Sequence, residues 1–280
     1  MPDTANSAQA PLLARDLTAL RTQLRTLRGS GAKLGFVPTM GALHEGHLEL
    51  VRHARAICDK VAVSIFVNPL QFAPTEDLDR YPRQEAADIA LLQAAGCDLV
   101  YLPTQDVLYP KGFVSRLEMN GPAQGLESDF RPQFFSGVMT VVMKLFNQVR
   151  PDAAVFGEKD YQQLAVIRAM VRDFDMGIDI VGVPTIREAD GLALSSRNAY
   201  LSAEERVVAP KLHQALERIR DVARSGGDTD KAIAEAKDDL IDAEFDRIDY
   251  IALRDADTLG ELTADSKAGR LLAAVWLGKT

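Results

Sequence analysis

The chain has 280 residues, of which 47% are hydrophobic and 26% charged, so it can bury a sizeable core and has the composition of an ordinary globular protein. Its net charge of −8 argues against a nucleic-acid partner, because phosphate backbones are bound by clustered Lys and Arg side chains. The N-terminal residues lack the pattern of a secretory signal, and no apolar run reaches membrane-spanning length. We therefore expect a cytoplasmic protein with no membrane partner, and we interpret Cys58 and Cys97 as buried free thiols.

Apolar periodicity predicts alternating helices and strands after a polar tail at residues 1–10. Helices are expected at 16–28, 47–59, 83–96, 137–152 and 161–174, and strands at 34–37, 61–69, 98–103, 115–120, 153–160 and 178–188. On the second helix, Leu48, Val51, Ala54, Ile57 and Cys58 are expected to share one face. Because strands that alternate with helices form βαβ units, this pattern predicts a mostly parallel, Rossmann-like α/β sheet.

The character of the sequence changes after Glu188. Residues 189–202 are polar and turn-rich, and Ser202 is placed to cap the helix that follows. Helices are expected at 203–226 and up to about residue 243, and strands at 247–259 and 269–278. We therefore predict a Rossmann-like substrate-binding domain over 1–185 and a smaller α+β domain over 186–280 that acts as a lid.

The stretch 34–54 contains a strand, a turn and the start of a helix that together could bind phosphate. A buried strand leads into a turn broken by Pro38 and Gly41, and a helix follows. This arrangement is typical of phosphate sites, because unpaired N–H groups and the positive end of the helix dipole point at the ligand. The turn contains His44 and His47 in the order His-x-Gly-His. Imidazole donors there would stabilise the charge that grows on phosphate oxygens during attack at the α-phosphorus.

Other nucleotide and metal sites fit this turn less well. The spacing of His44 and His47 is possible for a zinc pair, but no His-Glu-x-x-His register and no third ligand accompany them. The GxGxxG fingerprint of dinucleotide coenzymes and the Walker A pattern are both missing. The sequence therefore favours a nucleotide-phosphate site without a dedicated metal ion.

Polar residues at other expected strand ends and loops could complete such a site. The segment FGEKD at 156–160 follows a strand, so Lys159 could meet a phosphate and Asp160 a ribose hydroxyl, although the same residues would also suit a solvated turn. The loop LALSSRN at 192–198 could close over a triphosphate or form an ordinary turn and cap. The amide pairs Asn68/Gln71 and Gln162/Gln163 could orient a small hydroxy acid or serve as caps.

With these segments identified, the sequence resembles the pantothenate synthetase (pantoate–β-alanine ligase) family. The resemblance runs from about Leu34 to the last strand and rests on five motifs in the family's order: PTMGALHEGH, FVNPLQF, DLDRYPR, FGEKDYQQL and DGLALSSRN. The family belongs to the His-x-Gly-His nucleotidyltransferases, which are related in fold to class I aminoacyl-tRNA synthetases. It implies that pantoate and ATP form pantoyl adenylate and pyrophosphate, and that β-alanine then displaces AMP.

Carried over position by position, the resemblance implies roles for individual residues. His47 would be the proton donor and His44 its phosphate-binding neighbour. Gln71 would contact pantoate and β-alanine, Gln163 would contact pantoate, and Asn68 would contact one of the two. The residues implied for ATP are Met40, Gly41, Ala42, Leu43, His44, Glu45, Gly46, His47, Gly157, Glu158, Lys159 and Asp160, with Ile186 and Leu194 facing adenine and Ser195, Ser196 and Arg197 on the phosphates. Mg²⁺ would arrive with ATP, and the family implies a homodimer.

The chain departs from the family pattern at one loop. Where the family has Arg-Pro-Gly-His-Phe, this chain has Arg-Pro-Gln-Phe-Phe at 131–135, so Gln133 and Phe134 receive no catalytic role. Two alternatives stay open: a nucleotidyltransferase with a phosphorylated acceptor, and a nucleotide sensor without catalysis. The neutral acceptor-side residues Asn68, Gln71 and Gln163 favour a small carboxylic acid over the first, and two imidazoles exceed what binding alone requires in the second.

Overall fold

The computed structural model describes residues 9–29, 31–73 and 76–280, so most of the expected N-terminal tail lies outside the described residues. The chain forms two compact units. The first comprises Met1–Glu118 and Gln133–Pro184, and the second comprises Met119–Pro132 and Thr185–Thr280. The segment 119–132, which was expected in the N-terminal domain, is thus grouped with the C-terminal unit.

The first unit is built on a parallel sheet. Within the described residues this sheet has six strands in the order β1-β4-β3-β2-β5-β6, and every pairing is parallel. The strands are β1 (Leu12–Ala14), β2 (Leu34–Thr39), β3 (Lys60–Ile65), β4 (Leu99–Tyr101), β5 (Ala153–Gly157) and β6 (Asp179–Val183). The prediction of a mostly parallel, Rossmann-like α/β fold is confirmed.

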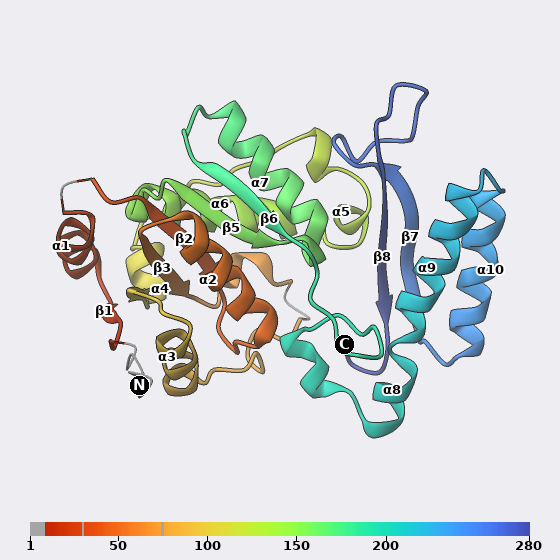
Figure 1. Cartoon of the computed structure of the whole chain (residues 1–280), viewed down its shortest axis with the longest axis horizontal. Coiled ribbons are helices and arrows are strands. Elements are labelled where there is room, and N and C mark those ends of the chain that lie inside the picture. The colour runs from red at the N-terminus through yellow and green to blue at the C-terminus, as the bar shows by residue number, and fades with distance from the viewer. Residues whose placement is uncertain (1–8, 30, 74–75) are drawn as a thin grey trace, which may run out of the picture. The chain divides into compact units, whose positions relative to one another are not determined.

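Helices flank this sheet, as Figure 1 shows. They are α1 (Leu17–Arg28), α2 (Glu45–Ile57), α3 (Glu85–Ala94), α4 (Gln105–Leu108), α6 (Phe134–Val149) and α7 (Tyr161–Asp173), with short 3₁₀ turns η1 (Pro69–Gln71) and η3 (Glu158–Asp160). Helix α2 packs against β2, β3 and β5, whereas α6 packs against α1 and α7. Among the described residues, no helix combines the length and apolarity that a membrane crossing requires.

The core of the first unit explains why the central strands are almost wholly apolar. In β2, Leu34, Phe36 and Val37 are fully buried, and in β3 so are Val61 and Val63. Strands covered by helices on both faces cannot alternate polar and apolar residues, so their sequences read as continuous hydrophobic runs. The carboxyl ends of β2, β3 and β5 therefore lie at one edge of a rigid, well-packed sheet.

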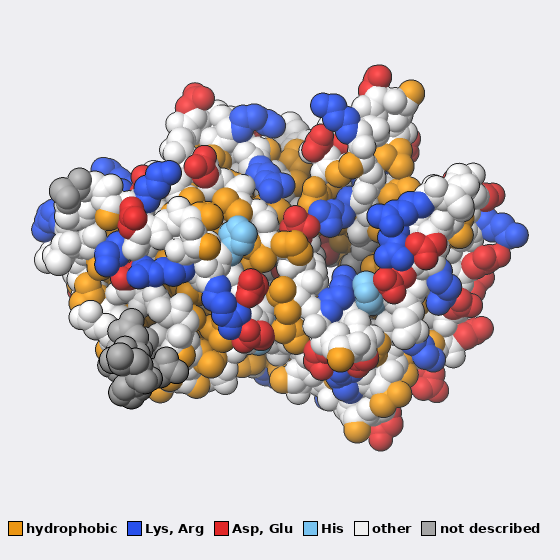
Figure 2. Space-filling view, in the orientation of Figure 1, with side chains coloured by type: hydrophobic (Ala, Val, Ile, Leu, Met, Phe, Trp, Pro, Cys, Tyr) orange, Lys and Arg blue, Asp and Glu red, His pale blue; other side chains and the backbone are white. Residues whose placement is uncertain are grey.

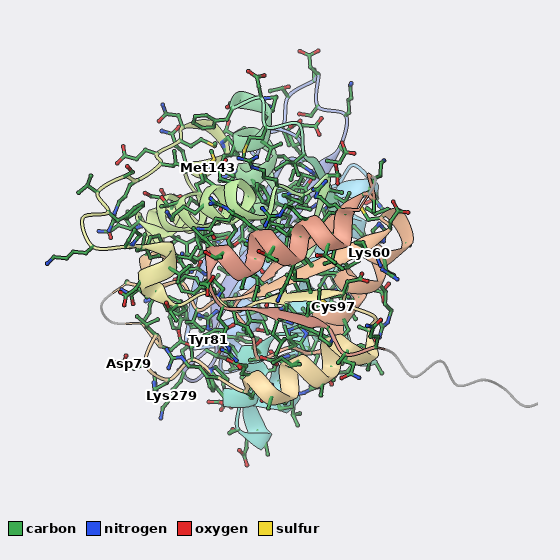
Figure 3. The ribbon with its side chains drawn as sticks, turned by 90° about the vertical axis from the view of Figure 1, so that its left-hand side faces the viewer. Lys60, Asp79, Tyr81, Cys97, Met143 and Lys279 are labelled. Carbon is green, nitrogen blue, oxygen red and sulfur yellow. The ribbon has the colours of Figure 1, made fainter. Side chains whose placement is uncertain are left out.

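Both cysteines are free thiols. Cys97, labelled in Figure 3, is buried, and its Sγ donates a weak hydrogen bond to the carbonyl of Leu99. Burial raises the pKa of Cys97 to about 12, and it also raises the pKa of the half-buried Cys58. Both groups therefore stay protonated near neutral pH and behave as small apolar side chains.

The second unit contains helices and an antiparallel strand pair. Its elements are η2 (Gly121–Ala123), α5 (Glu127–Phe130), η4 (Ser196–Tyr200), α8 (Ala203–Val208), α9 (Lys211–Arg224), α10 (Thr229–Asp242), β7 (Arg247–Asp255) and β8 (Gly269–Trp276). Strands β7 and β8 pair with each other, and α9 packs against α10 (Figure 1). The expected cap is present, because the Ser202 hydroxyl accepts from the Glu205 N–H while the Glu205 carboxylate accepts from the Ser202 N–H.

Several local predictions were wrong. Residues 115–120 form no strand, and β1 was not predicted because a strand of three residues has too little pattern to detect. The helix expected at 203–226 is divided into α8 and α9, since Pro210 has no N–H to continue the hydrogen-bond ladder. On α2, Ile57 is 41% exposed rather than buried with Leu48 and Val51, because at 3.6 residues per turn it lies on the opposite side of the helix from Leu48.

Candidate active site

The turn between β2 and α2 depends on glycine at position 41. Gly41 has φ of +86°, a left-handed conformation that other residues adopt only with strain. A Cβ there would also lie 3.0 Å from Oδ2 of Asp88 and 3.0 Å from Cγ2 of Ile65. The next residue, Ala42, has a positive φ of 51° as well. The backbone between Met40 and His44 is therefore sharply bent, and something must hold it there.

Asp88 of α3 holds this turn. Its side chain is 1% exposed, and its two oxygens accept from the backbone N–H of Ala42 at 3.0 Å and of Leu43 at 2.8 Å. The Leu43 side chain packs into the core of the first unit. The amides of Ala42 and Leu43 are thus bonded to Asp88. Asp88 was not predicted, although a carboxylate four residues before Leu92, on the buried face of α3, is a detectable signal.

The two histidines lie at the N-terminus of α2 with their rings 4.1 Å apart. His44 is the N-cap, and its Nδ1 accepts from the N–H of Gly46 at 3.2 Å. The Nδ1 of His47 accepts from the N–H of His44 at 3.3 Å, which completes a reciprocal capping box. Because Nδ1 of each ring accepts from a backbone amide, a neutral ring carries its proton on Nε2. Each imidazole is therefore an N–H donor of fixed tautomer.

Burial and neighbouring charge keep both rings neutral. The pKa of His47 is lowered to about 3, mainly by burial and then by His44 and Lys159, while Asp160 opposes the shift. The pKa of His44 is lowered by burial and by Lys159. The charges of Lys159 and Asp160 act on the imidazoles only at short range. The strands that lead into the two segments, β2 and β5, are also parallel neighbours in the sheet, so the structure brings FGEKD together with the histidine turn.

The 156–160 segment lies where β5 ends and η3 begins. Lys159 and Asp160 are exposed, and Nζ of Lys159 is 3.3 Å from Oδ1 of Asp160. A Cβ on Gly157 would meet no atom closer than 4.0 Å, so the space beside this glycine is open to a ligand. Glu45, in contrast, points its carboxylate toward Arg52 on the exposed face of α2. Gly46 contributes its backbone N–H, which donates to Nδ1 of His44.

The acid-side residues also belong to the first unit. Nε2 of Gln71 lies 3.0 Å from Sδ of Met40, which connects η1 to the histidine turn. Asn68 is buried and donates to Oε1 of Gln71 at 3.1 Å. Gln163 is half-buried in the first turn of α7, and its neighbour Gln162 is buried. Within the described residues, no group of three or more His, Cys, Asp and Glu side chains could hold a metal ion.

The remaining expected ATP residues belong to the second unit. The segment 186–194 folds back on itself, with the Leu194 N–H donating to the Ile186 carbonyl at 3.0 Å. Ser195 caps η4, and its hydroxyl accepts from the Arg197 N–H at 3.2 Å. Ser196 lies in the first turn of η4 and is half-buried. These residues therefore form one compact loop and cap.

The loop that departs from the family pattern leads directly into α6. This helix begins at Phe134, three residues earlier than predicted, and Gln133 precedes it without a side-chain cap. The rings of Phe134 and Phe135 meet edge to face at 5.0 Å, and Phe135 is buried. The aromatic side chain that replaces the family's histidine thus packs against its neighbour at the start of the helix.

Comparison with known proteins agrees with this geometry. The family model for pantoate-beta-alanine ligase matches residues 12–280. A pantothenate synthetase of Mesorhizobium japonicum is 53% identical over 96% of this chain and 95% of its own length, and one of Bradyrhizobium is 52% identical over 98% and 97%.

Solved structures agree as well. A pantothenate synthetase from Thermus thermophilus superposes with a TM-score of 0.89 at 47% identity, covering 96% of both chains. A pantoate-beta-alanine ligase from Francisella tularensis, complexed with beta-gamma ATP and β-alanine, gives a TM-score of 0.82 at 34% identity over 96% of this chain and 95% of that one. The resemblance noted in the motifs is thereby confirmed over nearly the whole chain, and the protein is a ligase that belongs to the pantoate–β-alanine ligase family.

Proposed function

We propose that this ligase joins pantoate and β-alanine into pantothenate through a pantoyl adenylate. A pantoate carboxylate oxygen attacks the α-phosphorus of ATP, and the bond to the bridging oxygen breaks so that pyrophosphate leaves. The β-alanine amine then attacks the activated carbonyl, loses a proton and displaces AMP. Adenylation is needed because a carboxylate is a poor electrophile, whereas AMP is a good leaving group.

The observation that carries this proposal is the histidine pair at the N-terminus of α2. Both imidazoles are neutral N–H donors held in place by backbone amides, and Lys159 supplies positive charge beside them. Donors aimed in advance at developing negative charge are the main source of catalysis in phosphoryl transfer. His47 is the proposed proton donor, since a bound triphosphate would raise the pKa of its ring from the low value in the free protein.

The acid would be held by neutral groups. We assign Gln71 to pantoate and β-alanine and Gln163 to pantoate, because side-chain amides donate to carboxylate and hydroxyl oxygens without adding charge. We assign Asn68, which is 1% exposed and bonded to Gln71, to one of the two acids as well. A phosphorylated acceptor would instead favour basic side chains at these positions, so the nucleotidyltransferase alternative has less support.

ATP would be bound by residues of both units. In the first, we assign 40–47 and Gly157–Asp160 to the phosphates and ribose. In the second, we assign backbone groups of Ile186 and Leu194 to adenine, and Ser195–Arg197 to the phosphates. Mg²⁺ enters as part of the nucleotide substrate, bound through phosphate oxygens. The second unit would then act as a lid over the nucleotide.

Isotope exchange between pyrophosphate and ATP tests the proposal. Exchange should require pantoate and should proceed without β-alanine, because the first step is complete before the amine enters. Exchange supported only by a different acid would show that this acid, and not pantoate, is the substrate. ATP binding without exchange under any acid would instead identify a nucleotide sensor.

We also propose a cytoplasmic homodimer that has neither nucleic acid nor membrane as a partner. Figure 2 shows basic and acidic side chains interspersed on the face in view, an arrangement that suits small-molecule substrates better than a polyanion. Light scattering coupled to size exclusion would measure the mass of the assembly, and a monomer would exclude the dimer.

A further inference from the structure

The buried amide of Asn68 is engaged on all sides within the first unit. Its Oδ1 accepts from the backbone N–H of Leu70 at 3.3 Å and from the hydroxyl of Tyr109 at 2.8 Å. Its Nδ2 donates to the backbone carbonyl of Gly137 at 3.2 Å and to Oε1 of Gln71 at 3.1 Å. These contacts join η1, the start of α6 and the residue that follows α4, which are far apart in the chain.

The orientation of this amide follows from the chemistry of its backbone partners. An N–H can only donate and a carbonyl can only accept, so Oδ1 of Asn68 must face Leu70 and Nδ2 must face Gly137. Turning the amide over would place like groups against each other at both contacts. The second hydrogen on Nδ2 therefore points at Gln71, whose Oε1 must accept it. Nε2 of Gln71 is thereby directed toward Met40 and the histidine turn.

Glycine at position 137 makes the backbone anchor possible. A Cβ there would lie 2.1 Å from the carbonyl oxygen of Leu70 and 2.8 Å from the amide nitrogen of Gln71. These are backbone atoms, which cannot rotate away as a flexible side chain would. Only glycine lets α6 approach η1 closely enough for its carbonyl to reach Asn68.

Tyr109 provides the other side-chain anchor. Burial raises the pKa of its phenol, so the hydroxyl remains a donor at every working pH. The centroid of its ring is 6.1 Å from that of Phe66 and 5.1 Å from that of Phe113, and packing against both rings restricts its rotation. No sequence motif pointed to this residue, which follows the short helix α4.

We infer that Tyr109 is a positioning residue for the acid substrate, because it acts through Asn68 to hold the amide of Gln71 with its N–H donors toward the Met40–His47 turn. This inference rests on the proposed function, which assigns Gln71 to pantoate. In the free protein the Gln71 donor faces the sulfur of Met40. A thioether is a weak acceptor, so a carboxylate or hydroxyl oxygen displaces it with a net gain.

Tyr109→Phe tests the inference, because it removes the hydroxyl and keeps the ring. We expect the KM for pantoate in pyrophosphate–ATP exchange to rise about three- to ten-fold, which is what one neutral hydrogen bond is worth. The KM for ATP and kcat should change less than two-fold. Tyr101→Phe is the matched control. The buried Tyr101 also donates to a side-chain amide oxygen at 2.8 Å, that of Gln148, about 16 Å along α6 from Gly137 at 1.5 Å per residue.

A double-mutant cycle with Gln71→Ala separates positioning from general stability. If Tyr109 acts through Gln71, Tyr109→Phe should not raise the pantoate KM further once Gln71 is alanine. An equal rise in both backgrounds, or no rise in the wild-type background, overturns the inference. Should Tyr109→Phe fail to fold, Asn68→Asp in the folded enzyme tests the next contact, from Asn68 to Gln71, because its second acceptor would turn the Gln71 amide over and raise the pantoate KM at least ten-fold. An unchanged pantoate KM in that variant overturns the inference, since Tyr109 can reach Gln71 only through Asn68.

The contacts that run from Tyr109 through Asn68 to Gln71 form a relay. Failure of the proposed function gives a different result from failure of this relay. Wild-type enzyme that exchanges pyrophosphate with ATP only in the presence of another acid refutes the assignment of pantoate. The same cycle is then measured with that acid, and the same outcomes decide the relay. Wild-type exchange that depends on pantoate, combined with an unchanged KM in Tyr109→Phe, refutes the relay alone.

Discussion

Asp88 is the residue whose replacement should most clearly separate the shape of the histidine turn from its chemistry. Asp88 touches no proposed substrate group, yet each of its oxygens accepts from one backbone amide of the turn. Asp88→Asn keeps the shape of the side chain, but its NH₂ group would face one of the two backbone N–H groups that the carboxylate accepts from. A buried donor that loses its partner costs about 1–3 kcal/mol. Asp88→Ala leaves the amides of both Ala42 and Leu43 without an acceptor and should cost about 2–6 kcal/mol.

These costs predict a graded response in thermal unfolding. At about 2–4 °C per kcal/mol for a unit of this size, Asp88→Asn should lower Tm by about 2–12 °C, and Asp88→Ala should lower it by about twice as much. Exchange of pyrophosphate into ATP should fall at least ten-fold in Asp88→Asn at a temperature where the variant is folded, because the imidazoles follow the turn. Asp173→Asn is the control, since that carboxylate is exposed at the end of α7.

Two results would refute this reasoning. If Asp88→Ala is no less stable than Asp88→Asn, the two oxygens do not each hold an amide. If both variants lose stability but keep wild-type exchange when folded, the turn is not what aims the histidines.

The remaining predictions concern the imidazoles and the glycine beneath η1. His47→Ala should lower the exchange kcat by about 10²–10³-fold, the usual effect of removing one strong electrostatic donor, and a rate within three-fold of wild type removes His47 from the mechanism. Because the folded pKa of His47 is about 3 against about 6.5 unfolded, the wild-type protein should lose stability as pH falls below 6.5, where only the unfolded state takes up the proton. At pH 4.5 this loss is about 2–3 kcal/mol relative to His47→Gln, measured by denaturant unfolding of both proteins at pH 7 and 4.5; parallel pH curves would contradict it. Gly137→Ala should lower Tm and raise the pantoate KM together, because its Cβ would overlap the Leu70 carbonyl; a crystal structure with η1 unmoved would disprove the steric argument.

The parts of the fold that could be predicted are those encoded by local periodicity. Helix α1 follows from its leucine stripe, and β2 and β3 follow from continuous apolar runs that are buried on both faces. Ser202 could be predicted as a cap because the capping box is local too. The break between α8 and α9 at Pro210 was not predicted, because the amphipathic pattern continues on both sides of the proline and hides the missing N–H.

The site could be predicted only as far as its motifs reach. His44 and His47 were found because they sit side by side in the sequence. Asp88 is 46 residues from Ala42, and Tyr109 is 41 residues from Asn68. No local period records such a contact, since it exists only after the sheet has brought the loops together. The low pKa of His47 was likewise out of reach, because it comes mainly from burial.

The contacts that sequence reasoning missed share one physical role. Asp88 holds the turn, backbone amides hold the imidazoles, and Gly137 together with Tyr109 holds the amide of Asn68. Each fixes a donor before substrate arrives, so little reorganisation remains when charge develops on the phosphate. Residues of this kind should therefore affect rate or KM without touching substrate. If variants of these anchors changed stability alone, the donors would have to be aligned by the substrates themselves, and the free structure would say little about catalysis.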